Sequence, residues 1–124
     1  MILAIALGGA VGAVGRYLAM SAVGHWMGHG FPWGTLAVNV AGSAAMGVLI
    51  EASALVWSPS PAVRALIVVG VLGAFTTFST FSLDAVFLLE RGRFAAAAAY
   101  VAGSVVLCVA ALYAAMQATR AVIA

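Results

Sequence analysis

Apolar residues dominate the chain in four long runs, at about residues 2–23, 34–57, 62–89 and 94–118. Short stretches rich in glycine, proline or charge separate the runs, at residues 24–33, 58–61 and 90–93. Each run is long enough to cross a bilayer, because a transmembrane helix needs about 20 apolar residues. The pattern therefore predicts an all-α membrane protein, with four transmembrane helices in a single domain over residues 1–124.

The third run predicts a broken helix. It spans about 28 residues, or about 42 Å as a helix, against a hydrocarbon core of about 30 Å. Its centre, at residues 73–81, reads GAFTTFSTF. Hydroxyl side chains compete with helical backbone hydrogen bonds, so we expect a break near the middle of this span. Carbonyls freed there, such as those of Gly73 and Thr76, need a partner at membrane depth, and a bound cation is one solution.

Composition supports the membrane assignment. Hydrophobic residues make up 66% of the chain and charged residues only 6%, and the mean hydropathy is +1.22. A soluble domain is typically about 25% charged, so this chain has too few charged residues to form a water-facing surface. The few arginines do not cluster, which argues against nucleic-acid binding. The first run lacks the preceding positive charge of a secretory signal, and we expect it to be retained.

The loop charges give no preferred orientation. Four spans would place Arg64 and Arg120 on one side of the membrane and Arg91 and Arg93 on the other. Orientation follows the arginine and lysine asymmetry between loops, and here the two sides tie. The tie predicts either a weak orientation preference or insertion in both directions, and insertion in both directions permits an antiparallel homodimer.

The first two spans carry polar residues within apolar sequence. Gly8, Gly12 and Arg16 recur at steps of four, a spacing that lets helix backbones approach closely. Arg16 either snorkels to the interface or serves a water-filled site. In the second span Asn39 offers two N–H donors without a formal charge, either as glue between helices or as a ligand for an anion. Its stripe of four-residue steps contains Thr35, Asn39, Ser43, Gly47 and, at the interface, Glu51.

The last two spans add aromatic rings and hydroxyls. Phe75, Phe78 and Phe81 recur at steps of three, as packing residues or as rings whose positive edges face an anion. Tyr100, Ser104 and Cys108 recur at steps of four in the fourth span. His25 and His29 have no third metal ligand nearby, and no nucleophile is paired with a base. We therefore expect neither a metal site at these histidines nor enzyme activity.

Three motifs together resemble the Fluc, or CrcB, family of fluoride channels. They are GGAVGAVGRY at residues 8–17, GTLAVNVAGS at residues 34–43 and GVLGAFTTFSTF at residues 70–81. The resemblance covers essentially the whole chain. It implies an antiparallel, dual-topology homodimer with two fluoride pathways at the subunit interface. It also implies a multi-pass protein of the bacterial plasma membrane that lowers intracellular fluoride.

The resemblance also implies roles for individual residues. Asn39 would donate its amide to fluoride, and Phe78 and Phe81 would present ring edges to it. The backbone carbonyls of Gly73 and Thr76 would hold a structural sodium ion at the dimer centre. The remaining pathway residues implied are Arg16 near a vestibule, Thr35, and the polar track of Tyr100 and Ser104 on the fourth span.

Two residues depart from the family pattern. Cys108 stands where the hydroxyl track often continues, and Asp84 stands where a glutamate is expected.

These features predict a fluoride-selective passive channel. The main alternative is a small dual-topology multidrug or cation exporter, which needs a titratable carboxylate in its first span, and residues 2–23 contain none. A membrane assembly protein without transport activity ranks last, because it explains neither Asn39 nor the hydroxyl cluster.

Overall fold

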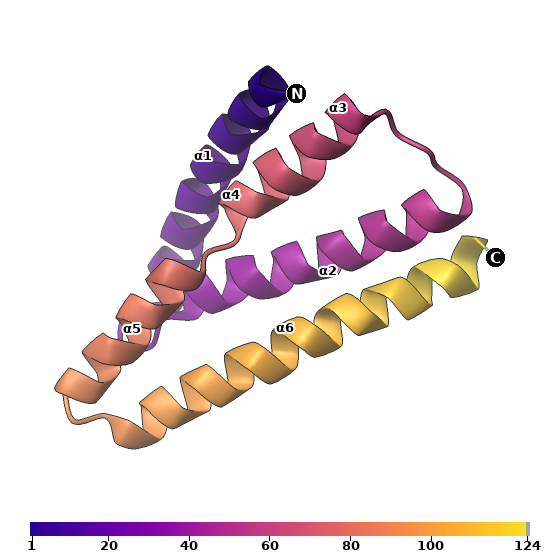
Figure 1. Ribbon diagram of the computed structural model, residues 1–124. Helices are drawn as coiled ribbons and strands as arrows, with labels where there is room; N and C mark the ends of the chain where they lie inside the picture. The colour runs from indigo at the N-terminus through magenta and orange to yellow at the C-terminus, as the bar shows by residue number, and fades with distance from the viewer. Residues whose placement is uncertain (124) are drawn as a thin grey trace.

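The computed structural model describes residues 1–123, and within them the chain folds into helices joined by short connections (Figure 1). Four helical stretches are long and apolar enough to cross a membrane, which confirms the predicted four-span architecture. The elements are α1 (Ile2–Met27), α2 (Trp33–Leu55), α3 (Pro61–Arg64), the π-helix η1 (Ala65–Leu72), α4 (Gly73–Phe75), α5 (Phe78–Glu90) and α6 (Phe94–Ile123). The elements α3 to α5 together form the third span.

Two helices run past their expected ends. Helix α1 continues to Met27, so His25 belongs to its last turn and not to a loop. Helix α6 continues to Ile123 and includes Arg120. The apolar runs did not set these ends, because Gly24, His25, Thr119 and Arg120 interrupt them while the backbone continues the helical hydrogen bonds.

The break predicted in the third span lies at Thr76 and Thr77, whose backbones are extended (ψ 158° and 119°). Helix α5 restarts at Phe78, where the Thr77 hydroxyl accepts a 3.1 Å hydrogen bond from the Thr80 N–H. This is a side-chain N-cap, which satisfies one of the backbone donors that a helix start leaves free. The break is thus a capped turn and not a frayed helix.

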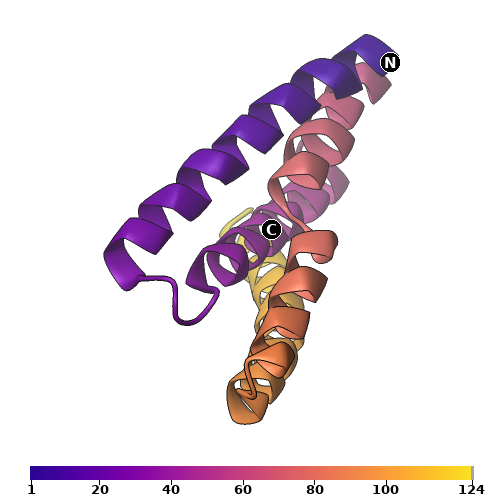
Figure 2. The same cartoon turned by 90° about the vertical axis from the view of Figure 1, so that its left-hand side faces the viewer.

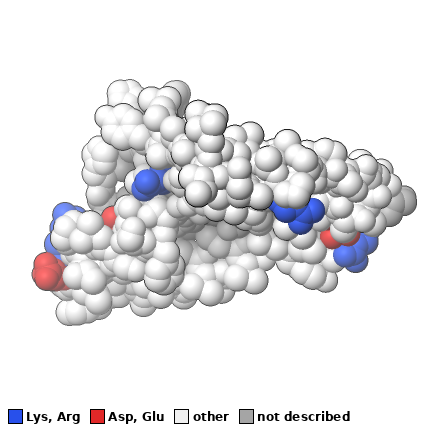
Figure 3. Space-filling view, turned by 45° about the horizontal axis from the view of Figure 1, so that its top comes forward, with Lys and Arg blue, Asp and Glu red and all other residues white. Residues whose placement is uncertain are grey.

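The spans alternate in direction. Figure 1 shows the N-terminus, the α2–α3 connection and the C-terminal end of α6 at one end of the molecule, with the other two connections at the opposite end. The two halves of the third span have different neighbours: η1 and α4 pack on α1, whereas α5 packs on the start of α6 (Figures 1 and 2). Charged side chains are few and gather mostly toward the two ends (Figure 3). The arrangement suits a bilayer, whose apolar core would lie between those ends.

Glycines allow the helices to approach each other. A Cβ built on Gly8 would lie 2.2 Å from the Leu66 carbonyl oxygen, and one on Gly12 would lie 2.1 Å from that of Val71. The small residues expected to pack in the first span therefore hold α1 against η1. Gly47 plays the same part between α2 and α6, where its Cβ would lie 2.3 Å from the Leu112 carbonyl oxygen.

An ion pair joins the ends of α2 and α6. Glu51 lies near the end of α2, is only 4% exposed, and accepts a 2.8 Å hydrogen bond from Arg120 Nε. The sequence suggested an interfacial position for Glu51, but it did not reveal this burial or the partner. Arg120 is 69 residues away in the chain, and the two side chains meet because α2 and α6 pack side by side and run in the same direction (Figure 1).

We predict that Gly12→Ala destabilises the protein while Gly9→Ala does not. The Gly12 Cβ would collide with backbone, whereas nothing lies within 4 Å of a Cβ on Gly9. Overpacking costs about 1–3 kcal/mol, and alanine in an open helical position gains about 1 kcal/mol over glycine. Thermal unfolding in detergent measures the difference: the midpoint should fall for Gly12→Ala and hold or rise for Gly9→Ala. Equal midpoints would contradict the close packing of α1 on η1.

Candidate functional site

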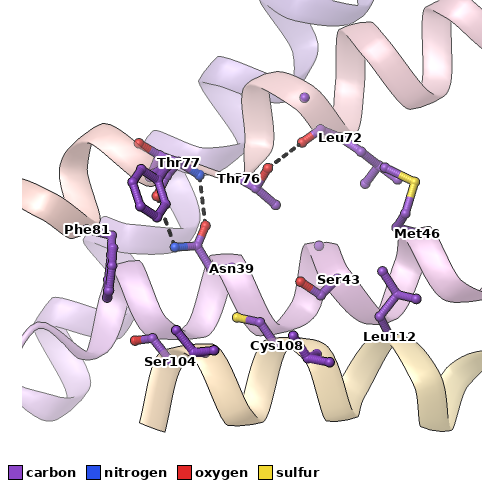
Figure 4. Close-up of a pocket in the computed structure, with 15 residues that line it drawn as sticks. Asn39, Ser43, Met46, Leu72, Thr76, Thr77, Phe81, Ser104, Cys108 and Leu112 are labelled. Atoms are coloured by element: carbon purple, nitrogen blue, oxygen red, sulfur yellow. Dashed lines mark hydrogen bonds between the residues drawn. The ribbon is translucent and has the colours of Figure 1, made fainter. Parts of the chain in front are cut away.

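Asn39 holds the break in the third span against α2. Its Nδ2 donates to the Thr77 carbonyl oxygen at 3.0 Å, and its Oδ1 accepts from the Thr77 N–H at 2.8 Å (Figure 4). One side chain thus satisfies both backbone groups of a residue that has left the helix. A carboxamide has two N–H donors, so this pairing leaves one of them for another partner. Asn39 therefore joins helices and keeps a donor free.

Other backbone groups freed by the break are satisfied individually. Arg16 Nε donates to the Ala74 carbonyl oxygen at 3.0 Å. The Leu72 carbonyl oxygen accepts from both the Thr76 N–H and the Thr76 hydroxyl. Within residues 1–123, the carbonyls of Gly73 and Thr76 accept no hydrogen bond. These two oxygens are available to a ligand, and they are the pair that the sequence singled out.

A cavity of about 420 Å³ lies at the break, between α2, the third span and α6 (Figure 4). Most of its lining is apolar, but uncharged hydrogen-bonding groups reach it from all three sides. Of the residues expected to form a pathway, it is lined by Asn39, Phe78, Phe81 and Ser104, and the sodium-site candidates Gly73 and Thr76 line it too. The structure therefore brings together six residues that are spread over more than half the sequence.

Ser104 contributes an unused hydrogen-bonding group to this cavity. The residue is 6% exposed, and its Oγ is buried with no hydrogen-bond partner among the described residues. A buried polar atom without a partner costs about 1–3 kcal/mol. A bound polar ligand in the cavity would remove that cost.

The phenylalanine stripe divides between two environments. Phe78 is 78% exposed and Phe81 8%, with ring centroids 5.4 Å apart. The Phe81 ring also packs against the Tyr100 ring, with their centroids 5.1 Å apart. The Phe75 ring instead lies beside Gly15 of α1, outside the cavity. Two of the three rings therefore belong to the cavity, and the third packs helices together.

Tyr100 and Thr35 form a separate buried cluster with Asp84. Asp84 Oδ2 accepts hydrogen bonds from the Thr35 hydroxyl at 2.7 Å and the Tyr100 hydroxyl at 3.1 Å. Both donors are almost completely buried. Since each hydroxyl has one proton, neither can donate to an anion while it is bonded to the carboxylate. Both residues were expected beside the pathway, and the structure gives Asp84 as their shared partner.

Asp84 also connects this cluster to a second cavity. That cavity has a volume of about 220 Å³, and Thr35, Asp84, His29 and Arg91 are among its lining residues. The sequence did not assign Asp84 a role. The signal that could have found it is its position, because a carboxylate within a transmembrane segment is costly and needs a partner.

Arg16 lies at the break and does not line either cavity. Its hydrogen bond to Ala74 ties α1 to the end of α4. A half-buried guanidinium is thereby used to satisfy a carbonyl that the interrupted helix cannot. In this chain its vestibule position stays a prediction.

The first cavity has the chemistry of a site for a small anion. It offers the free N–H of Asn39, the hydroxyls of Ser43 and Ser104, and the ring of Phe81. The cavity lining contains no charged side chain in the described part of the chain. Neutral donors can replace the water around an anion without holding it as tightly as a fixed cation would.

Comparison with known proteins gives a consistent result. The sequence model of the family described as "CrcB-like protein, Camphor Resistance (CrcB)" matches residues 3–116. A protein of Rhodospirillum centenum named "Fluoride-specific ion channel FluC" is 56% identical over 124 residues, covering 100% of this chain and 98% of that protein. Proteins of the same name from Nitrobacter winogradskyi and a Chelativorans strain are 53% and 51% identical, over 98% and 96% of this chain and 96% and 95% of their own lengths.

We predict that Asn39→Leu strongly destabilises the protein, because it leaves the Thr77 N–H and carbonyl unpaired. Each unpaired buried group costs about 1–3 kcal/mol. Ser43→Ala is the matched control: Ser43 is one turn along α2, lines the same cavity and makes no hydrogen bond among the described residues. Unfolding in detergent should show a large loss for Asn39→Leu and a small one for Ser43→Ala. Similar losses would show that the Asn39–Thr77 pairing does not hold the break.

Proposed function

The chain belongs to the CrcB-like family, and from that membership we propose that it is a fluoride-selective passive ion channel that lowers intracellular fluoride. Its matched relatives carry the name of fluoride-specific ion channels over nearly their full lengths. The family is one of ion channels and not of enzymes. The protein is a multi-pass membrane protein, and we place it in the bacterial plasma membrane.

The observation that carries this proposal is the cavity at the break, with its unused neutral donors. Fluoride is small and strongly hydrated, so a pathway must offer close donors in place of water. Conduction also requires binding weak enough for the ion to leave. The free Asn39 N–H and the unpartnered Ser104 hydroxyl meet both needs. The edges of the Phe78 and Phe81 rings, which carry partial positive charge, add to them.

A proton-coupled exporter of drugs or cations is not favoured. Such a mechanism needs a titratable carboxylate inside the first span, and α1 contains no acidic residue. Asp84, the carboxylate within the third span ahead of the terminal Glu90, already accepts two hydroxyl hydrogen bonds.

The working unit we propose is an antiparallel homodimer. Irregular backbone does not face lipid within the hydrocarbon region, because nothing there can satisfy it. In this chain Gly73, Phe78 and Ser79 are exposed around the break, which falls near the middle of the third span. A second copy that covers this face would shield the break. The tied loop charges support opposite orientations for the two copies.

A structural sodium ion at the centre of that dimer is the second part of the proposal. The Gly73 and Thr76 carbonyls are the fitting groups, since they accept no hydrogen bond within residues 1–123. Carbonyl oxygens suit a hard cation, and two copies would supply two from each. The ion's positive charge would lower the cost of bringing an anion into a medium of low dielectric constant.

The function is tested with purified protein in liposomes loaded with potassium fluoride or potassium chloride. Ion-selective electrodes follow each anion after valinomycin provides a path for potassium. We expect rapid fluoride efflux, little chloride efflux, and dependence on valinomycin but not on a proton gradient. Equal efflux of the two anions, or none of fluoride, would contradict the proposal. Proton-driven efflux of a cationic drug would favour the exporter.

The same assay tests the aromatic rings. Phe78→Ile and Phe81→Ile should slow fluoride efflux by roughly tenfold or more, the factor that corresponds to about 1.4 kcal/mol at the barrier. Phe75→Ile is the control, because its ring packs beside Gly15 outside the cavity. It should keep most of the efflux. Unchanged efflux in all three variants would show that Phe78 and Phe81 only pack and do not serve the ion pathway.

The dimer and its sodium ion can be tested together. Photobleaching of singly labelled chains in liposomes should show two subunits per channel. The dimer's thermal stability should fall when sodium is replaced by the bulky cation N-methylglucamine. Thr76→Ala should keep this sodium dependence, because the ligand is the backbone carbonyl. A single subunit per channel would contradict the proposed dimer. A thermal stability that does not depend on sodium would contradict the proposed sodium ion.

A further inference from the structure

Cys108 is the sole cysteine of the chain, and it faces the cavity at the break. It lies one helical turn after Ser104 on α6, and its side chain extends toward α2 (Figure 4). The residue is half-buried, so its sulfur is neither fully packed nor open to the surroundings. Asn39 and Ser43 approach the same space from the opposite wall.

A second observation ties this position to a ligand. Ser104, on the same face of α6, has a buried Oγ without a partner. The orphaned Ser104 hydroxyl and Asn39, which has a spare N–H, both line this cavity, and a polar ligand bound there would supply the missing hydrogen bonds. A free cysteine is often only a small apolar packing residue. Here it adjoins open space and unused donors.

We propose that Cys108 is a thiol modification site on the anion route of this channel, and the proposal rests on the function proposed above. A small neutral reagent that reaches the cavity would convert the thiol into a mixed disulfide. The attached group would narrow the route beside Ser104 and replace the weak S–H donor with a group that donates no hydrogen bond.

The chemistry balances with methyl methanethiosulfonate. The Cys108 thiolate attacks the sulfenyl sulfur of the reagent, a new S–S bond forms, and the reagent's own S–S bond breaks. Methanesulfinate leaves with the electron pair, and the thiol proton passes to solvent. Because the thiolate is the nucleophile, the reaction is run at mildly alkaline pH. Dithiothreitol reverses it by thiol–disulfide exchange.

The experiment compares fluoride efflux from liposomes before and after the reagent. Efflux through the unaltered chain should fall by roughly tenfold or more, a factor equal to about 1.4 kcal/mol at the barrier. Intact mass should show one methylthio group per chain, and dithiothreitol should restore both mass and efflux. The Cys108→Ser variant has no thiol, so the reagent should change neither its mass nor its own rate.

A relocated thiol provides the matched control. Val106 lies two residues away on the exposed side of α6 and does not line the cavity. The double variant Cys108→Ser, Val106→Cys should accept the label without losing efflux.

Two results would overturn the inference while leaving the channel assignment intact: a labelled Cys108 with undiminished efflux, or a Cys108 that resists labelling while Val106→Cys reacts. Absence of fluoride efflux from the untreated protein would instead overturn the proposed function, and this inference with it.

Discussion

The pairing of the Asn39 carboxamide with the backbone of Thr77 is the interaction on which the rest of the site depends. A break within a transmembrane helix exposes peptide groups where no water is available to satisfy them. Asn39 satisfies one N–H and one carbonyl at once. Arg16 and the Thr76 hydroxyl satisfy carbonyls on the other side of the break. The third span can therefore change direction, and α5 can place Phe78 and Phe81 at the cavity.

Close helix packing is what allows such short side chains to reach the break. Gly42 lies against Thr76, whose Cγ2 would be 2.3 Å from a Cβ at that position. A larger residue there would push α2 away from the third span and lengthen both Asn39 hydrogen bonds. Gly8 and Gly12 similarly keep α1 close enough for Arg16 to bond Ala74. The polar side chains therefore depend on the glycines, because their hydrogen bonds form only when the helices approach closely.

The sequence predicts the four-span architecture well, but it predicts the hydrogen bonds between distant segments poorly. Four apolar runs give four spans, and hydroxyl crowding at residues 73–81 gives the break, because both depend on local composition. Asn39 stands out because a carboxamide is unusual within an apolar span, whereas the pathway roles of Phe78 and Phe81 follow from the resemblance of the motifs to the family. The hydrogen-bond partners were not predicted, since the Thr77 backbone, Ala74 and Asp84 are contacts between distant segments. Glu51 shows the same limit: its type and position were visible, but Arg120 lies 69 residues further on.

A single chain satisfies only part of what the bilayer demands. The face that carries exposed Phe78 also carries the break, together with the Gly73 and Thr76 carbonyls that have no donor within residues 1–123. If this face met lipid, unsatisfied carbonyls would lie in hydrocarbon at a cost of several kcal/mol each. Water could relieve the cost only by entering the membrane. In the proposed homodimer, a second copy with a cation between the two chains would remove the same cost and would leave the Ser104 and Asn39 donors facing a closed route. The exposed break that would be costly for a lone chain in lipid is therefore the feature that would form the channel in the proposed pair.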